Sequence, residues 1–208
     1  MFLADADMDR ACLRQGDILE RIPFPVFALN EIRVLGEIKS GEADSPYPAI
    51  VAALREHRKD PNYFTAQLSM RLAFGAVFSH CCELEPTNGH LRPSTFRVAR
   101  LVPVRKSIMN SPEKLASLRA NRDPRDPSNP GFIDYFYVPA HELLENTEWM
   151  IDFEQVIPLP GNEFPAILSQ KILQMDDRSR VKFKIKAAIH LGRITNEEDQ
   201  AGLSDPWK

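Results

Sequence analysis

The sequence lacks most of the features that reveal the class of a protein directly. It has nine glycines against seventeen prolines, which favours rigid connections and strand ends over flexible linkers. It has three cysteines, Cys12, Cys81 and Cys82, and an odd number without framework spacing argues against a disulfide-stabilised secreted scaffold. No apolar run approaches the roughly 18 residues of a membrane span, and the N-terminus is acidic where a signal peptide is basic. These absences predict a cytoplasmic protein with no membrane partner.

The net charge of the chain is small, but basic and acidic residues are concentrated in separate segments. The formal net charge of the 208 residues is −3, so the whole chain has no strong field that would attract a polyanion. Residues 178–193, however, contain six basic residues and no acidic one, and the segment 196–208 contains four acidic residues and one lysine. The basic segment is predicted either to bind a polyanion or to be neutralised by the acidic tail.

Short apolar or alternating runs bounded by proline dominate the chain. They predict strands at 14–29, 31–38, 64–74, 76–84, 95–104, 132–139 and 148–160. Helices are predicted at about 49–60 and 111–122, the second with Ser111 as N-cap and proline behind it, and a short helical turn is predicted at 140–146. The segment 176–194 fits both a helix and a strand, and its length and Gly192 favour a helix. The sequence predicts a mainly β, α+β fold: a curled antiparallel sheet or a small SH3-like barrel with peripheral helices.

The predicted organisation is one β-barrel-like domain over residues 1–160, with the two helices as insertions. Residues 161–208 are predicted to form a C-terminal helical segment that packs on this domain and ends in the acidic tail. A chain of 208 residues suits one decorated domain.

The string "SHCCE" at 79–83 is the most distinctive group of polar side chains. If the strand continues through it, His80 and Cys82 share one face, because side chains alternate along a strand. His90 follows the Asn88-Gly89 turn, so His80, Cys82 and His90 are three candidate metal ligands, which would make zinc the ion. The usual paired C-x-x-C ligands are absent, so the leading expectation is that the protein has no cofactor.

Two other interpretations of the same string remain open. His80 could lower the pKa of the Cys82 thiol with Glu83 as orienting acid, which makes His80, Cys82 and Glu83 candidate catalytic residues. Alternatively, Ser79, His80 and Glu83 form a polar cluster that only fixes the strand end. No nucleophile elbow, phosphate loop or paired-histidine helix occurs.

A nucleic-acid surface is a further candidate. The proposed binding residues are Ser79 at the strand end, Arg97 and Arg100 on the strand 95–104, and Tyr135 and Tyr137 on the strand 132–139. Aromatic rings stack on bases and arginines contact phosphates. The alternative is that the aromatic alternation is core and that the lysines of the last helix face solvent.

Four segments follow one another along the chain: the "QGDI" turn at 15–18, the apolar strand that runs into Ser79-His80-Cys81-Cys82-Glu83, the strand "RVARLVPV" and the strand "FYVP". In this respect residues 14–160 resemble a set of small bacterial proteins with a Gly-Asp-Ile start and a Ser-His/Gln-x-Cys-Asp signature. These look like relatives of the SH3-like barrel of MazF/PemK toxins. The chain differs in having Glu83 in place of the usual aspartate and an additional cysteine, Cys81.

Together these observations predict a binding or accessory module. The resemblance implies a nucleic-acid or toxin/defence context, with nucleic acid or another protein as partner. The alternative is a metal- or thiol-dependent hydrolase that uses His80 and Cys82. The sequence allows a homodimer but contains no feature that requires one.

Overall fold

The structure is a computed structural model that describes residues 1–26, 33–34, 66–67, 69–80, 84, 94–122 and 131–192. The chain divides into two compact units, one made of Met1–Arg21 with Ala73–Lys208 and the other of Ile22–Leu72. The predicted helix at 49–60 lies outside the described residues, as do Cys81, Cys82, Glu83 and His90.

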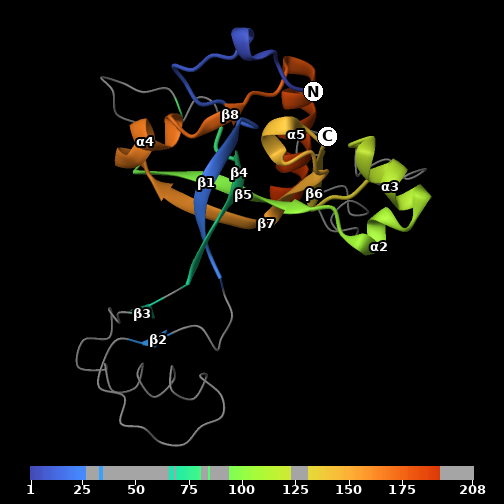
Figure 1. Ribbon diagram of the computed structural model, residues 1–208, viewed down its shortest axis with the longest axis horizontal. Coiled ribbons are helices and arrows are strands. Elements are labelled where there is room, and N and C mark those ends of the chain that lie inside the picture. The colour runs from blue at the N-terminus through green and yellow to red at the C-terminus, as the bar shows by residue number, and fades with distance from the viewer. Residues whose placement is uncertain are drawn as a thin grey trace, which may run out of the picture. The chain divides into compact units, whose positions relative to one another are not determined.

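A six-stranded antiparallel sheet forms the centre of the first unit (Figure 1). Its strand order is β6-β7-β5-β4-β1-β8. The strands are β1 (Ile18–Pro25), β4 (Met70–Val77), β5 (Thr95–Pro103), β6 (Tyr135–Val138), β7 (Trp149–Pro160) and β8 (Lys171–Leu173). In the described part of the chain β6 and β8 stand at the two ends of this order, so the sheet is open. This confirms the predicted mainly β, α+β class, with a sheet in place of a closed barrel.

Helices accompany the sheet. They are α2 (Lys106–Met109), α3 (Pro112–Arg119), α4 (Phe164–Leu168) and α5 (Asp177–Leu191), with 3-10 turns η1 (Asp5–Asp7), η5 (Glu142–Leu144) and η6 (Gly161–Glu163). The predicted start of α3 is confirmed, because the Ser111 side chain accepts a hydrogen bond from the Lys114 backbone N–H. None of the helices in the described part is long and apolar enough to cross a membrane. In the second unit, β2 (Arg33–Val34) pairs with β3 (Ala66–Gln67).

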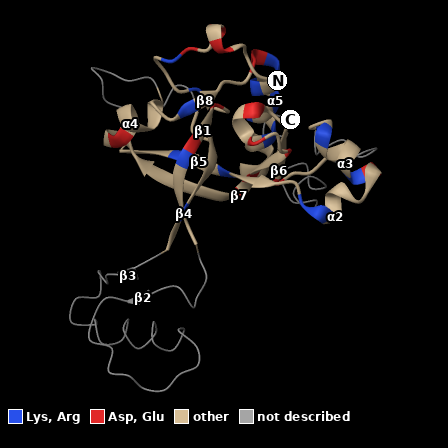
Figure 2. Ribbon diagram, viewed as in Figure 1, with Lys and Arg blue, Asp and Glu red and all other residues tan. Residues whose placement is uncertain are grey.

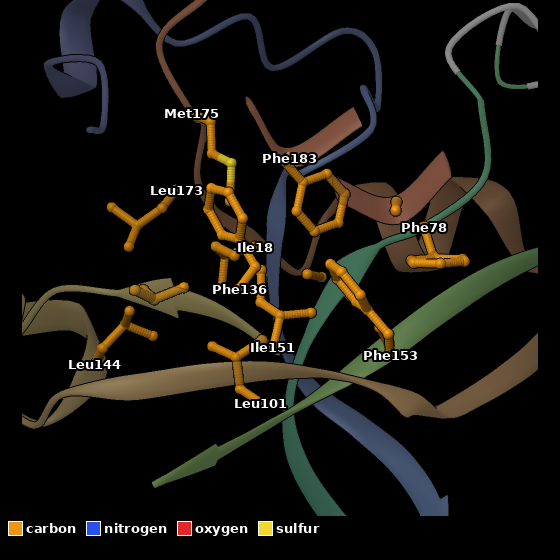
Figure 3. Packing of buried hydrophobic residues seen from close by; sticks show 14 residues of the cluster. Ile18, Phe78, Leu101, Phe136, Leu144, Ile151, Phe153, Leu173, Met175 and Phe183 are labelled. Atoms are coloured by element: carbon orange, nitrogen blue, oxygen red, sulfur yellow. The ribbon is translucent and has the colours of Figure 1, made fainter. Parts of the chain in front are cut away.

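The main core lies between the sheet and α5. Figure 3 shows Phe183 of α5 among aromatic rings from β6, β7 and the end of β4. The Phe183 ring centre lies 5.2 Å from that of Phe136, 5.6 Å from that of Phe153 and 6.3 Å from that of Phe78. Within the segment 176–194, residues Asp177–Leu191 form the helix α5, as favoured, and this helix buries Phe183 and Ala187 against the sheet.

The opposite face of the sheet packs against α2 and α3. Val104, Ile108, Leu118, Tyr137 and Met150 form a second buried cluster there. Because Ala99 and Leu101 belong to the main core and Val102 and Val104 to this cluster, the side chains of β5 alternate between two covered faces. The sheet is thus a layer between α5 and the α2–α3 pair.

Two sequence expectations about β4 are wrong. The predicted strands 64–74 and 76–84 do not meet as separate strands, because β4 runs through their boundary and ends at Val77. Met70 and Leu72 are more than half exposed, although their alternation predicted a buried face. Alternation shows which side chains share a side of a strand, but not whether another element covers that side.

Candidate functional site

The segment after β4 is a bend and not a continuation of the strand. Ser79 lies in this bend, and the backbone N–H groups of Phe78 and Ser79 both donate to the Arg97 carbonyl, at 2.8 and 3.3 Å. β4 therefore ends before His80, and the predicted common face of His80 and Cys82 falls on residues that lie partly outside the described part of the chain. His80 is exposed, while Cys82, Glu83 and His90 lie outside the described residues.

Ser79 fastens the bend to the sheet. It is buried, and its Oγ accepts a hydrogen bond of 2.9 Å from the Arg97 backbone N–H. This hydroxyl therefore links the bend to β5, while the predicted cluster of Ser79 with His80 and Glu83 involves Glu83, which lies outside the described residues. Within the described residues no group of three His, Cys, Asp or Glu side chains could hold a metal ion.

The Gly-Asp turn lies directly beside this bend. Gly16 has a φ of +92°, where a side chain would be strained, and its N–H donates to the Val77 carbonyl at 2.8 Å. The Gln15 side chain donates from Nε2 to the Phe78 carbonyl at 2.9 Å. The Gly-Asp turn and the end of β4, about 60 residues apart along the chain, therefore pack against each other.

A buried ion pair starts from the same turn. Asp17 Oδ2 lies 2.7 Å from Lys171 Nζ, and both side chains are 1 % exposed. Burial raises the pKa of Asp17, although the Lys171 ammonium and a hydrogen bond from the Arg14 N–H partly oppose this. Lys171 Nζ also contacts the carbonyls of Asp9 and Cys12. Sequence reasoning missed Lys171, because nothing local marks a lysine whose partner is 154 positions away.

The predicted nucleic-acid residues do not form one surface. Arg97 and Arg100 are three residues apart on β5 and so point to opposite faces. Tyr137 is 9 % exposed and its hydroxyl donates to Glu148 at 2.5 Å; burial first, and then this hydrogen bond, raise the pKa of Tyr137 to about 12. Its ring is part of the α2–α3 cluster and is not presented for stacking.

Arg100 and Tyr135, in contrast, share a face. Arg100 pairs with Asp152 in the ladder, and Asp152 pairs with Tyr135, so the three side chains form one row across β5, β7 and β6. A bulge follows in β7, where Phe153–Gln155 separate the partners of Arg100 and Ala99. Asp152 accepts hydrogen bonds from the Glu154 N–H and from Gln155 Nε2, so its carboxylate is already hydrogen-bonded within β7.

An aromatic pair and an arginine continue this row. The ring centres of Phe132 and Tyr135 are 6.4 Å apart, and both residues are half-buried. The Arg105 guanidinium carbon lies 5.3 Å from the centre of the Tyr135 ring, and Arg105 Nη2 donates to the Tyr135 hydroxyl at 2.7 Å. The pKa of Tyr135 is raised, mainly by burial and next by the Asp152 carboxylate.

The two helices next to this pair are basic. Residues 105–122 contain one acidic residue, Glu113, and five basic residues, all exposed: Arg105, Lys106, Lys114, Arg119 and Arg122. Figure 2 shows this concentration of Lys and Arg on α2 and α3. Arg119 forms a salt bridge with Glu148. A charge count over residues 105–122 identifies these basic residues from the sequence, but their position beside Tyr135 comes only from the fold.

Comparison of the chain with protein families, with curated proteins and with solved structures found no match in any of the three. The fold and the site themselves define the class of this protein: an open antiparallel sheet between helical layers, with two basic helices beside an aromatic pair.

Proposed function

We propose that this protein is a binding module for single-stranded nucleic acid. The contact surface is the basic segment 105–122 together with Phe132 and Tyr135. The observation that supports this best is the juxtaposition of exposed basic side chains on α2 and α3 with the Tyr135 ring, which Arg105 joins.

Single strands fit this surface because it offers rings as well as charges. Proteins that bind single strands combine a basic track with aromatic side chains on which bases stack, and the bases must be unpaired to do so. The Phe132–Tyr135 pair is half-buried, so its position is fixed by the cluster beneath it while part of each ring remains accessible. Arg105 adds a planar cation beside the ring.

The negative net charge of the chain is compatible with this proposal. Charges separated by more than about 10 Å are largely screened at 0.1 M salt, so a ligand at α2–α3 responds mainly to the local excess of basic residues. If about four phosphates are neutralised, affinity should fall roughly 50-fold between 50 and 200 mM salt, from the single-strand slope of about −0.7 per contact.

The test is fluorescence anisotropy of a labelled 20-nucleotide RNA and the matching DNA at 50 and 200 mM salt. Tyr135→Ala should weaken binding about 5- to 150-fold, since one stacked base contributes about 1–3 kcal/mol. Tyr135→Phe keeps the ring and should bind nearly as the parent protein does. Arg105→Ala with Lys106→Ala should reduce both the affinity and the slope of its salt dependence.

Arg178→Ala is the matched control, because Arg178 is an exposed basic residue on α5. If Arg178→Ala weakens binding while the Tyr135 and Arg105 variants do not, the surface is wrongly placed. If the parent protein binds neither oligonucleotide at 50 mM salt, or prefers the duplex, the proposed function is wrong.

A further inference from the structure

Helix α5 has a second apolar side that faces outward. Its inner side buries Phe183 and Ala187 in the main core. On the outer side, Val181 is 54 % and Ile185 46 % exposed; these two residues are one turn apart and therefore adjacent. Ala188 continues the row and is also exposed. A helix that only covers a sheet has a polar outer face, so this apolar row needs a separate explanation.

Basic side chains border the apolar row. At 100° per residue, Lys182 and Lys184 lie on its two flanks and Arg178 lies near its first turn. Residues 178–192 contain five basic residues and no Asp or Glu. An occupant that complements this surface must be both apolar and acidic, because a basic border attracts carboxylates and the row between needs aliphatic or aromatic cover.

The chain itself contains such a segment immediately after α5. Residues 194–208 contain four acidic side chains, Glu197, Glu198, Asp199 and Asp205, together with the apolar side chains of Ile194, Leu203 and Trp207. Helix α5 has 15 residues and is about 22 Å long at 1.5 Å per residue. An extended chain covers that distance in about seven residues, so the segment is long enough to turn and run back along the whole helix.

We propose that the C-terminal segment 194–208 of this chain docks on the outer face of α5, with Leu203 and Trp207 against the Val181–Ile185 row and the acidic residues against its basic border. The docked segment would shield the apolar row and neutralise much of the charge of α5. This surface is separate from the one proposed for nucleic acid, and the two proposals are tested by different variants.

Trp207 is one of two tryptophans in the chain, the other being Trp149, so its emission can be isolated as the difference between the parent protein and Trp207→Phe. In the docked state this difference spectrum should be blue-shifted and resistant to iodide quenching. Ile185→Glu and Val181→Glu should shift it to the position seen in denaturant and increase quenching several-fold. Leu143→Glu is the matched control, because Leu143 is a similarly exposed leucine (47 %) on η5, and it should change nothing.

A second set of variants tests the charges without touching the helix. Replacement of Glu197, Glu198 and Asp199 by the corresponding amides should release Trp207 at a lower salt concentration than in the parent protein. If Trp207 of the parent protein is already as accessible as in denaturant, the proposal is wrong.

A second copy of the chain is the main competing occupant. Sedimentation velocity over a hundredfold range of concentration distinguishes the two cases, because a docked tail leaves a monomer whose Trp207 emission is independent of concentration. A dimer that Ile185→Glu dissociates without any change in Trp207 would assign the face to self-association and overturn the proposal.

Discussion

Lys186 is a charged side chain on the packed face of α5. It is 2 % exposed, and its Nζ has no hydrogen-bond partner among the described residues. The Phe136 ring centre lies 6.0 Å from Nζ and offers a weak cation–π contact. Burial alone lowers the pKa of Lys186 from 10.5 to about 8. A lysine in this position reduces the stability of the fold whenever it is protonated.

Lys186→Met should therefore stabilise the protein by up to about 3 kcal/mol at pH 7, since each pKa unit corresponds to about 1.4 kcal/mol. Between about pH 8 and 10.5 the unfolded chain binds more protons than the folded one, so the stability of the parent protein rises with pH in that window. The advantage of the variant should accordingly fall by half or more at pH 9.5. Urea unfolding monitored by tryptophan fluorescence measures both values.

Lys182→Met, on the exposed side of the same helix, serves as control and should change stability by less than about 0.5 kcal/mol. A gain from Lys186→Met that does not depend on pH would show that shape, and not charge, explains the effect.

At the scale of elements, the outer edge of β6 is closed by one side chain. Asn121, just after α3, accepts the Tyr137 N–H at 2.7 Å through Oδ1 and donates from Nδ2 to the Tyr137 carbonyl at 2.9 Å. Its φ of 45° is left-handed, a conformation that asparagine tolerates better than most residues. The side chain thus replaces a neighbouring strand at an edge that would otherwise be open to pairing.

Asn121→Gly keeps the left-handed backbone and removes both hydrogen bonds, so it should cost about 1–3 kcal/mol of stability. Asn121→Ala removes the same bonds and adds backbone strain, and it should cost about 1 kcal/mol more. In both variants the rate of amide hydrogen exchange should increase most at Tyr137. Equal losses of stability in the two variants would mean that backbone strain plays no part. An unchanged exchange rate at Tyr137 would mean that the Asn121 side chain does not protect the edge of β6.

The helices and strands also show which parts of the fold could be predicted from the sequence. Ser111 and Pro112 predicted the start of α3, because capping depends on residues within one turn. The largely apolar run that ends near Pro103 predicted β5, because a strand covered on both faces carries apolar side chains on both. The three-residue strand β8 was not predicted, because its stability comes from pairing with β1, where Ile18 lies opposite Leu173. The sequence predicted neither Lys114 nor Arg122 as part of the basic surface, because the distance from a helix to Tyr135 is a property of the fold.

At the scale of the whole molecule, the Asp17–Lys171 pair connects segments far apart in the sequence. Lys171 on β8 contacts Asp17 at the start of β1, the carbonyls of Asp9 and Cys12 in the N-terminal segment, and Gln174 Oε1 at 2.9 Å. Asp17 Oδ1 is buried and has no hydrogen-bond partner among the described residues, so the pair is strongly desolvated. Such a pair adds little net energy against apolar residues, but the loss of one partner leaves a buried charge uncompensated.

Asp17→Asn and Lys171→Met should each destabilise the protein by about 3–5 kcal/mol, because each leaves the opposite charge buried alone. The double variant should cost much less than the sum of the two, since it removes both charges. Urea unfolding of the four proteins, with Trp149 near the start of β7 as reporter, gives the coupling energy. Additive costs, or single costs below about 1 kcal/mol, would show that the pair does not hold the N-terminal segment, β1 and β8 together. In that case the fold would depend on the packing of α5 and the sheet alone.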